Sequence, residues 1–256
     1  MSILLAKELK ELLRTRRWLV LPILFVVFGI AGPALVRLLP VLLESAGAGL
    51  EIVLPPTSPA DGYSQFLQSI NELGILAVIL VFMGLIASER KSGTLAALLV
   101  NPVSRLSFVW AKWLVNGAYT LLSFVLGAAF AIAYSYLLLG PPDLGALLGA
   151  TGMYLSYLLL AFSWTLWLSA LVRSPAAAGG LSLIPLFLLP MLGILWRPLA
   201  DYGPYGVVGA ATRLVGGMGV ASVPVESPAF VSLAVNLLLS TLLALAAYGA
   251  LRRAEL

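Results

Sequence analysis

The sequence predicts an all-α polytopic membrane protein with six transmembrane helices. Of its 256 residues, 61% are hydrophobic and only 10% are charged, whereas about a quarter of the residues in an ordinary globular domain are charged. The mean hydropathy is +1.04. Several apolar segments reach the roughly 20 residues that a helix needs to cross a hydrocarbon core of about 30 Å. No repeat or low-complexity linker divides the chain, so residues 1–256 are interpreted as a single transmembrane domain.

Hydropathy and basic residues together predict the spans and their orientation. The six spans are expected at residues 19–42, 71–88, 112–139, 146–172, 176–196 and 229–251. Twelve of the fifteen Lys and Arg residues lie in the N-terminal segment, in the stretch 88–113, at Arg173, or at the pair Arg252 and Arg253. These places share one side if the helices alternate. The positive-inside rule makes that side the cytoplasm and puts both termini there.

Two long connections are expected on the extracellular side. Residues 43–70 contain the Pro-rich stretch LPPTSPADGYSQF, which predicts a loop. Residues 197–228 are rich in Gly and Pro but keep short apolar runs. This second segment is either a plain surface loop or a re-entrant pair of short helices, which is permitted at membrane depth only where it is buried in protein.

An amphipathic helix is predicted at the N-terminus, within residues 1–18. Leucines at positions 5, 9, 12 and 13 recur at helical spacing and form an apolar stripe. Such a helix lies in the headgroup plane of the bilayer, with its leucines toward acyl chains and its basic residues toward anionic lipid. In the simpler alternative the charges only set the topology. The basic residues are Lys7, Lys10, Arg14, Arg16 and Arg17.

A polar cytoplasmic hairpin is predicted at residues 89–111. Glu89 and Arg90 follow the second span, and Gly93 permits a tight reversal. Thr94 caps a short helix that ends before Pro102, because proline disfavours helical geometry in the preceding residue.

The short helix of the hairpin carries three leucines, Leu95, Leu98 and Leu99. An apolar ridge outside the membrane would be an exposed patch, so it should contact a partner protein or lie against lipid. Ser104 is expected to cap the helix that leads into the third span.

The hairpin sequence ERKSGTLAALLVNPVSRLSFVWAK resembles the signature of type-2 ABC transporter permeases, the membrane subunits of many ATP-driven exporters. The resemblance implies a coupling helix that docks on a nucleotide-binding ATPase subunit, which binds ATP and Mg²⁺. It also implies a dimer of permeases in a prokaryotic inner membrane, with the second and fifth spans near the dimer axis and the last outer loop re-entrant. The implied ATPase interface comprises Glu89, Arg90, Gly93, Thr94, Leu95, Leu98, Leu99, Pro102 and Arg105.

The residues exclude several kinds of site within this chain. A phosphate-cradling loop needs a Gly-Lys pair followed by Ser or Thr, and the sequence contains no Gly-Lys pair. ATP hydrolysis is therefore expected on another polypeptide, and no catalytic residue is assigned here. Cys and His are both absent, which removes disulfides, zinc sites and imidazole proton relays from consideration. No metal site and no cofactor bound by this chain are expected. No nucleic-acid partner is expected either.

Two alternatives to the permease interpretation come from other classes. A channel or ion-coupled secondary transporter usually holds ionisable residues at membrane depth. The central stretches LGILAVILVFMGLIA and AAAGGLSLIPLFLLPMLGIL contain none, which argues against this class. A membrane scaffold without transport activity fits the composition, but it leaves the leucine ridge unexplained.

Overall fold

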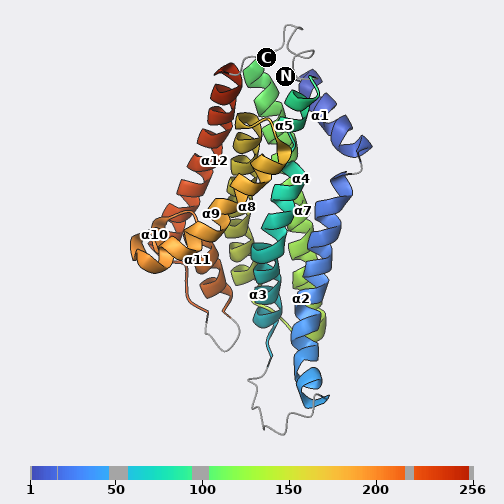
Figure 1. The fold of residues 1–256 in the computed structure, drawn as a ribbon. Helices are drawn as coiled ribbons and strands as arrows, with labels where there is room; N and C mark the ends of the chain where they lie inside the picture. Colours follow the sequence, from blue (N-terminus) through green and yellow to red (C-terminus); the bar gives the residue numbers. More distant parts are fainter. Residues whose placement is uncertain (1, 16, 46–56, 94–103, 217–221, 254–256) are drawn as a thin grey trace.

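The computed structural model describes residues 2–15, 17–45, 57–93, 104–216 and 222–253, and this part of the chain is almost entirely helical. Within it, six helical stretches are long and apolar enough to cross a membrane: Arg17–Leu42, Pro59–Lys91, Arg105–Leu139, Leu144–Leu171, Pro175–Leu195 and Ser227–Arg252. They form an elongated bundle (Figure 1). The predicted fold class is therefore confirmed.

Five of the spans are each built on one main helix. These helices are α2 (Val20–Ser45), α7 (Arg105–Leu139), α8 (Leu144–Leu171), α9 (Pro175–Leu195) and α12 (Ser227–Arg253). The second span joins α3 (Pro59–Ser69), the π-helical turn η2 (Ile70–Gly74), α4 (Ile75–Phe82) and α5 (Ala87–Lys91). The chain begins with α1 (Ser2–Arg14) and the 3-10 turn η1 (Arg17–Leu19), and α10 (Arg197–Tyr202) and α11 (Gly206–Val215) connect α9 to α12.

The basic segments of the chain gather at one end of the bundle. Helix α1, helix α5, the start of α7 and the end of α12 all lie there, whereas the end of α2 and the start of α3 lie at the opposite end (Figure 1). Because the positive-inside rule assigns the basic end to the cytoplasm, both termini are cytoplasmic, as predicted.

Glycines allow α2 and α7 to touch backbone to backbone. A Cβ atom added at Gly127 would lie 2.7 Å from both the carbonyl oxygen and the Cβ of Phe25. A Cβ added at Gly29 would collide with the carbonyl oxygen of Gly127. Small residues at such crossings let helices approach closely within a membrane, where association depends on packing.

The second span begins twelve residues earlier than predicted, at Pro59 instead of residue 71. The Pro-rich composition suggested a loop over residues 43–70, but only residues 46–58 lie between helices α2 and α3 in the chain. Ser58 and Asp61 form a capping box, and Pro59 occupies the first turn, where its missing N–H costs nothing. Burial of Tyr63 and Phe66 then stabilises the helix.

The cytoplasmic half of the second span is interrupted at residues 83–86, between α4 and α5. The backbone N–H groups of Ile86 and Ala87 both donate to the hydroxyl of Ser169 on α8, at 2.9 and 3.0 Å. One side chain of the fourth span thus satisfies the donors that the helix break leaves without a helical partner. Helix α5 is a separate short element held against α8.

The segment between α9 and α12 is re-entrant over residues 197–216. The ring of Tyr205, at the start of α11, packs 5.8 Å from that of Tyr157, which lies near the middle of α8, about 20 Å from either end. Polar side chains of α12 form hydrogen bonds with backbone groups of the turn at this depth. Ser232 accepts from the N–H of Val207 (3.0 Å), and Asn236 donates to the carbonyl of Pro204 (3.1 Å). The plain surface loop is therefore excluded for these residues.

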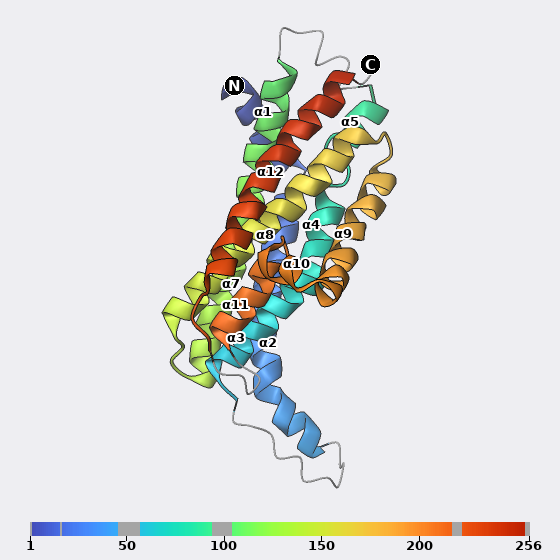
Figure 2. The ribbon, with the colours of Figure 1, turned by 90° about the vertical axis from the view of Figure 1, so that its left-hand side faces the viewer.

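Helix α9 lies at the edge of the bundle (Figure 2). Only 17% of its most apolar stretch is buried, the lowest fraction among the six spans of the described chain. Phe187 is 71% exposed and Met191 is 62% exposed. The fifth span therefore offers a broad apolar face that no described part of this chain covers.

The contact between α2 and α7 generates a stability prediction. Replacing Gly127 by Ala should lower the free energy of unfolding by about 1–3 kcal/mol, because the new methyl group meets backbone atoms that cannot move aside. Thermal unfolding in detergent measures the effect. Gly152→Ala is the control, since a Cβ there meets nothing within 4 Å. Equal unfolding temperatures for the two variants would contradict the backbone contact.

Candidate functional site

A buried lysine joins three helices at the cytoplasmic end of the bundle. The side chain of Lys112, on α7, is fully buried. Its Nζ lies 3.1 Å from a carboxylate oxygen of Glu8 on α1 and 2.9 Å from one of Glu89 on α5. The Glu8 and Glu89 side chains are only 3% and 13% exposed. An unpaired charge in such a position would be strongly destabilising, so these ion pairs hold the three helices together.

A second lysine, Lys7, extends this cluster toward solvent. Its Nζ lies 3.1 Å from Glu8, 3.4 Å from Glu11 and 3.6 Å from Glu89. Partial burial acts to lower the pKa of Lys7, but the surrounding carboxylates outweigh it and raise the pKa above its ordinary value. Lys7 therefore stays charged at neutral pH.

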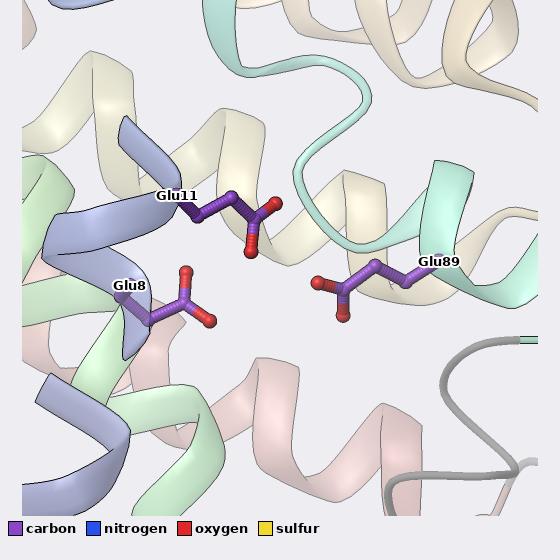
Figure 3. A group of neighbouring side chains, drawn as sticks. All are labelled: Glu8, Glu11 and Glu89. Carbon is purple, nitrogen blue, oxygen red and sulfur yellow. The ribbon is translucent and has the colours of Figure 1, made fainter. Parts of the chain in front are cut away.

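The three glutamates of the cluster point toward one another (Figure 3). Three convergent carboxylates could in principle ligate a divalent cation. Here the ammonium groups of Lys7 and Lys112 lie between them and supply the positive charge that a metal ion would. We therefore interpret the cluster as a structural ion-pair network.

Two arginines of the hairpin cap the cytoplasmic ends of other spans. The guanidinium of Arg90 donates to the carbonyl of Ala170 at 2.8 Å, at the end of α8. That of Arg105 donates to the carbonyl of Leu251 at 2.9 Å, at the end of α12. The last carbonyls of a helix have no intrahelical partner and carry partial negative charge, so each arginine satisfies and stabilises a helix terminus.

The two described ends of the hairpin can be compared with the prediction. Gly93 has a φ of +74° with open space around it, a conformation that favours glycine. Ser104 caps α7 by accepting a hydrogen bond from the N–H of Ser107 at 3.1 Å. The predicted short helix lies outside the described residues, together with Thr94, Leu95, Leu98, Leu99 and Pro102.

Helix α1 is amphipathic, but its apolar stripe is divided between two surroundings. Leu12 is buried near α7 together with Leu4 and Glu8, whereas Leu9 and Leu13 are about half exposed. The predicted stripe toward lipid therefore holds for only part of the set. Of the predicted basic residues, Lys10, Arg14 and Arg17 are exposed, and Arg16 lies outside the described residues.

The central members of the network escaped the sequence-based assignment. Glu8 and Lys112 were not predicted as site residues, although Lys112 is the final lysine of the signature quoted above. The distance along the chain explains the omission, because Lys112 and Glu8 are 104 residues apart. Only the lysine position within the signature could have drawn attention to this pair.

Comparisons with known proteins agree with the architecture. A family model described as "ABC-2 family transporter protein" matches residues 2–205. The chain is also 27% identical over 181 residues to "Uncharacterized transmembrane protein YxlG" of Bacillus subtilis (strain 168), and the match covers 70% of each chain.

The buried network yields a prediction about stability. Lys112→Met removes the buried partner of Glu8 and Glu89 and leaves them only the part-exposed Lys7, which should cost up to about 3–5 kcal/mol. Limited proteolysis of α1 and thermal unfolding in detergent report the loss.

Two variants complete this experiment. Adding Glu8→Gln and Glu89→Gln to Lys112→Met should recover much of the stability, because no unpaired buried charge remains. Lys10→Met is the control, since Lys10 is exposed and makes no salt bridge within the described residues. A Lys112→Met protein as stable as Lys10→Met would contradict the proposed role.

Proposed function

This chain belongs to the ABC-2 family of transporter proteins, and we propose that it is an exporter permease driven by separate nucleotide-binding ATPase subunits. As a family member it is a multi-pass membrane permease of an ABC transporter and a non-catalytic subunit, located in bacteria in the inner membrane. The direction of transport and the coupling to the ATPase are part of the proposal. ATP and Mg²⁺ would bind to the partner subunit.

The observation that carries the proposal is the attachment of the hairpin to the rest of the bundle. At its first end, Glu89 pairs with Lys112 and Arg90 caps α8; at its second end, Arg105 caps α12. A segment fixed to so many helices moves them when it moves. This supports a role in passing ATPase motion to the spans.

The ion pairs determine which helices a force on the hairpin would move. A force on the hairpin would act on α5 and on the start of α7, which Lys112 links to each other and, through Glu8, to α1. Breaking a pair inside the network would leave a buried charge, so small forces move the three helices as one body. The arginine caps carry the same displacement to the ends of the fourth and sixth spans.

The exposed face of α9 supports the proposal of a dimer. Its large apolar side chains include Phe187, Met191, Ile194 and Leu195, which are 62–84% exposed. Lipid could cover such a face, but a second permease copy would bury it as well. The proposed assembly is therefore two permeases with two ATPase subunits in the bilayer.

The ion-coupled alternative loses one argument that counted against it. The second span begins at Pro59, so Glu72 lies within that span and not beyond its outer end. Ion-coupled transporters usually hold an ionisable residue at this depth, so the composition of the spans no longer argues against ion coupling. Family membership, however, favours the ABC permease over a channel or a secondary transporter.

The docking role of the leucine ridge can be tested by charge. Leu98→Asp with Leu99→Asp should leave membrane insertion intact but reduce co-purification of the ATPase more than about tenfold, because an apolar contact would have to bury charge. The tagged permease is purified from its native membrane in mild detergent, and ATP hydrolysis by the purified sample measures how much ATPase it retains. Leu98→Met with Leu99→Met, which conserves volume, should retain the ATPase. Normal yield with the aspartates would reject the docking role.

The dimer can be tested directly, because the chain contains no native cysteine. Phe187→Cys on α9 should form a disulfide-linked dimer in native membranes under mild oxidation, visible on a non-reducing gel. Leu137→Cys on α7 is the control, with the same 71% exposure of the native side chain. If both variants cross-link equally, or neither does, α9 does not face a second copy.

A further inference from the structure

The second span carries an acidic residue near the middle of the membrane. Gly74 packs against the ring of Phe25, which lies eight residues, or about 12 Å of helix, beyond Arg17 at the cytoplasmic membrane surface. Glu72 lies two residues farther toward the outer side, at a depth of about 15 Å. In a hydrocarbon core of about 30 Å this is the mid-plane.

The side chain of Glu72 points away from the bundle, since Glu72 and Leu73 are both exposed in this chain. Within the described residues Glu72 forms no salt bridge. A carboxylate facing lipid at this depth would be costly, so acidic residues inside membranes normally face a bundle interior or a water-filled cavity. The face of the second span that points away from the bundle must therefore contact something more polar than lipid.

The Glu72 carboxylate has an amide donor beside it but no cation within the described residues. The amide N–H of Gln68 donates to the Glu72 carboxylate at 3.0 Å, and that of Asn71 donates to the hydroxyl of Tyr205 at 3.1 Å. The Asn71 Oδ1 is buried without a hydrogen-bond partner. One amide donor leaves most of the acceptor capacity of the Glu72 carboxylate unused and its negative charge uncompensated within the described residues, which suits a ligand with a positively charged donor group.

The backbone at this site is unusual as well. Residues Ile70–Gly74 form a π-helical turn, and such turns occur mostly as single insertions and frequently at functional sites. Asn71 is also tied to the re-entrant segment through Tyr205. The π-helical turn therefore presents Asn71 to the re-entrant segment and the neighbouring Glu72 to the exposed face of the second span.

We propose that Glu72 and Gln68 form a binding site for a cationic group, an ammonium or guanidinium, on the cargo as it crosses the membrane. This inference rests on the proposed transport function and adds a substrate class to it. An ammonium group is a pure donor, and its charge-assisted hydrogen bond to Glu72 would compensate a carboxylate that has no cation of its own.

The absence of native cysteines allows a test that requires neither the ATPase nor the cargo. Leu73→Cys, at a position 52% exposed beside Glu72, is the reporter. In native membranes it should react with a cationic methanethiosulfonate on the order of tenfold faster than with an anionic one of similar size, because the carboxylate attracts the first and repels the second. Glu72→Gln should bring this ratio close to one, and Glu72→Asp should preserve it.

A control at the same membrane depth distinguishes a water-accessible face from a lipid-covered one. Leu126 on α7 is 44% exposed, and its neighbour Gly127 also packs against Phe25. Leu126→Cys should react slowly with both reagents. The proposal fails if Leu73→Cys reacts equally slowly, because the face is then not accessible to water. It also fails if Glu72→Gln leaves the ratio of the two labelling rates unchanged, because the face is then not a cation site.

A ligand arm tests the cargo class. Decylammonium should protect Leu73→Cys from labelling, whereas decanol at the same concentration should not. Equal protection by both, or by neither, would overturn a cation site. These results are independent of ATPase co-purification, so failure of the cation site and failure of the proposed function remain distinguishable.

Discussion

The burial of one ammonium group governs the cytoplasmic end of this protein. Lys112 is removed from water, and a charge in that position must be compensated where it stands. The compensation comes from Glu8 on α1 and Glu89 on α5, so the electrostatic requirement of one side chain determines where two other helices lie. The hairpin is consequently rooted in a junction that resists independent movement of its parts. Such rigidity suits the transmission role proposed for the hairpin.

The sequence predicted much of this fold because membrane spans leave a strong local signal. Six apolar stretches, the positive φ at Gly93 and the cap at Ser104 follow from composition and short-range chemistry. The start of the second span did not follow, because proline and polar residues near Pro59 resemble a loop until the burial of Tyr63 is known. Local sequence signals predict that a helix exists, but they do not predict how far tertiary contacts extend it.

The candidate site was predictable in part for a related reason. The signature identified the two ends of the hairpin, yet the partners of its charged residues come from distant helices. Hydropathy could not separate a re-entrant segment from a surface loop, since the difference lies in whether Ser232 and Asn236 meet its backbone. The predicted interface residues at 94–103 lie outside the described chain and stay predictions.

The joint between α4 and α5 has a mechanical consequence. Two backbone donors share the single hydroxyl of Ser169 in a buried environment. Swinging α5 away from the fourth span would remove the acceptor of both buried donors at once. Intermediate positions are therefore penalised, and the joint should be either closed or open. In the proposed coupling to an ATPase, such a joint would convert a graded force on α5 into a discrete step of the second span.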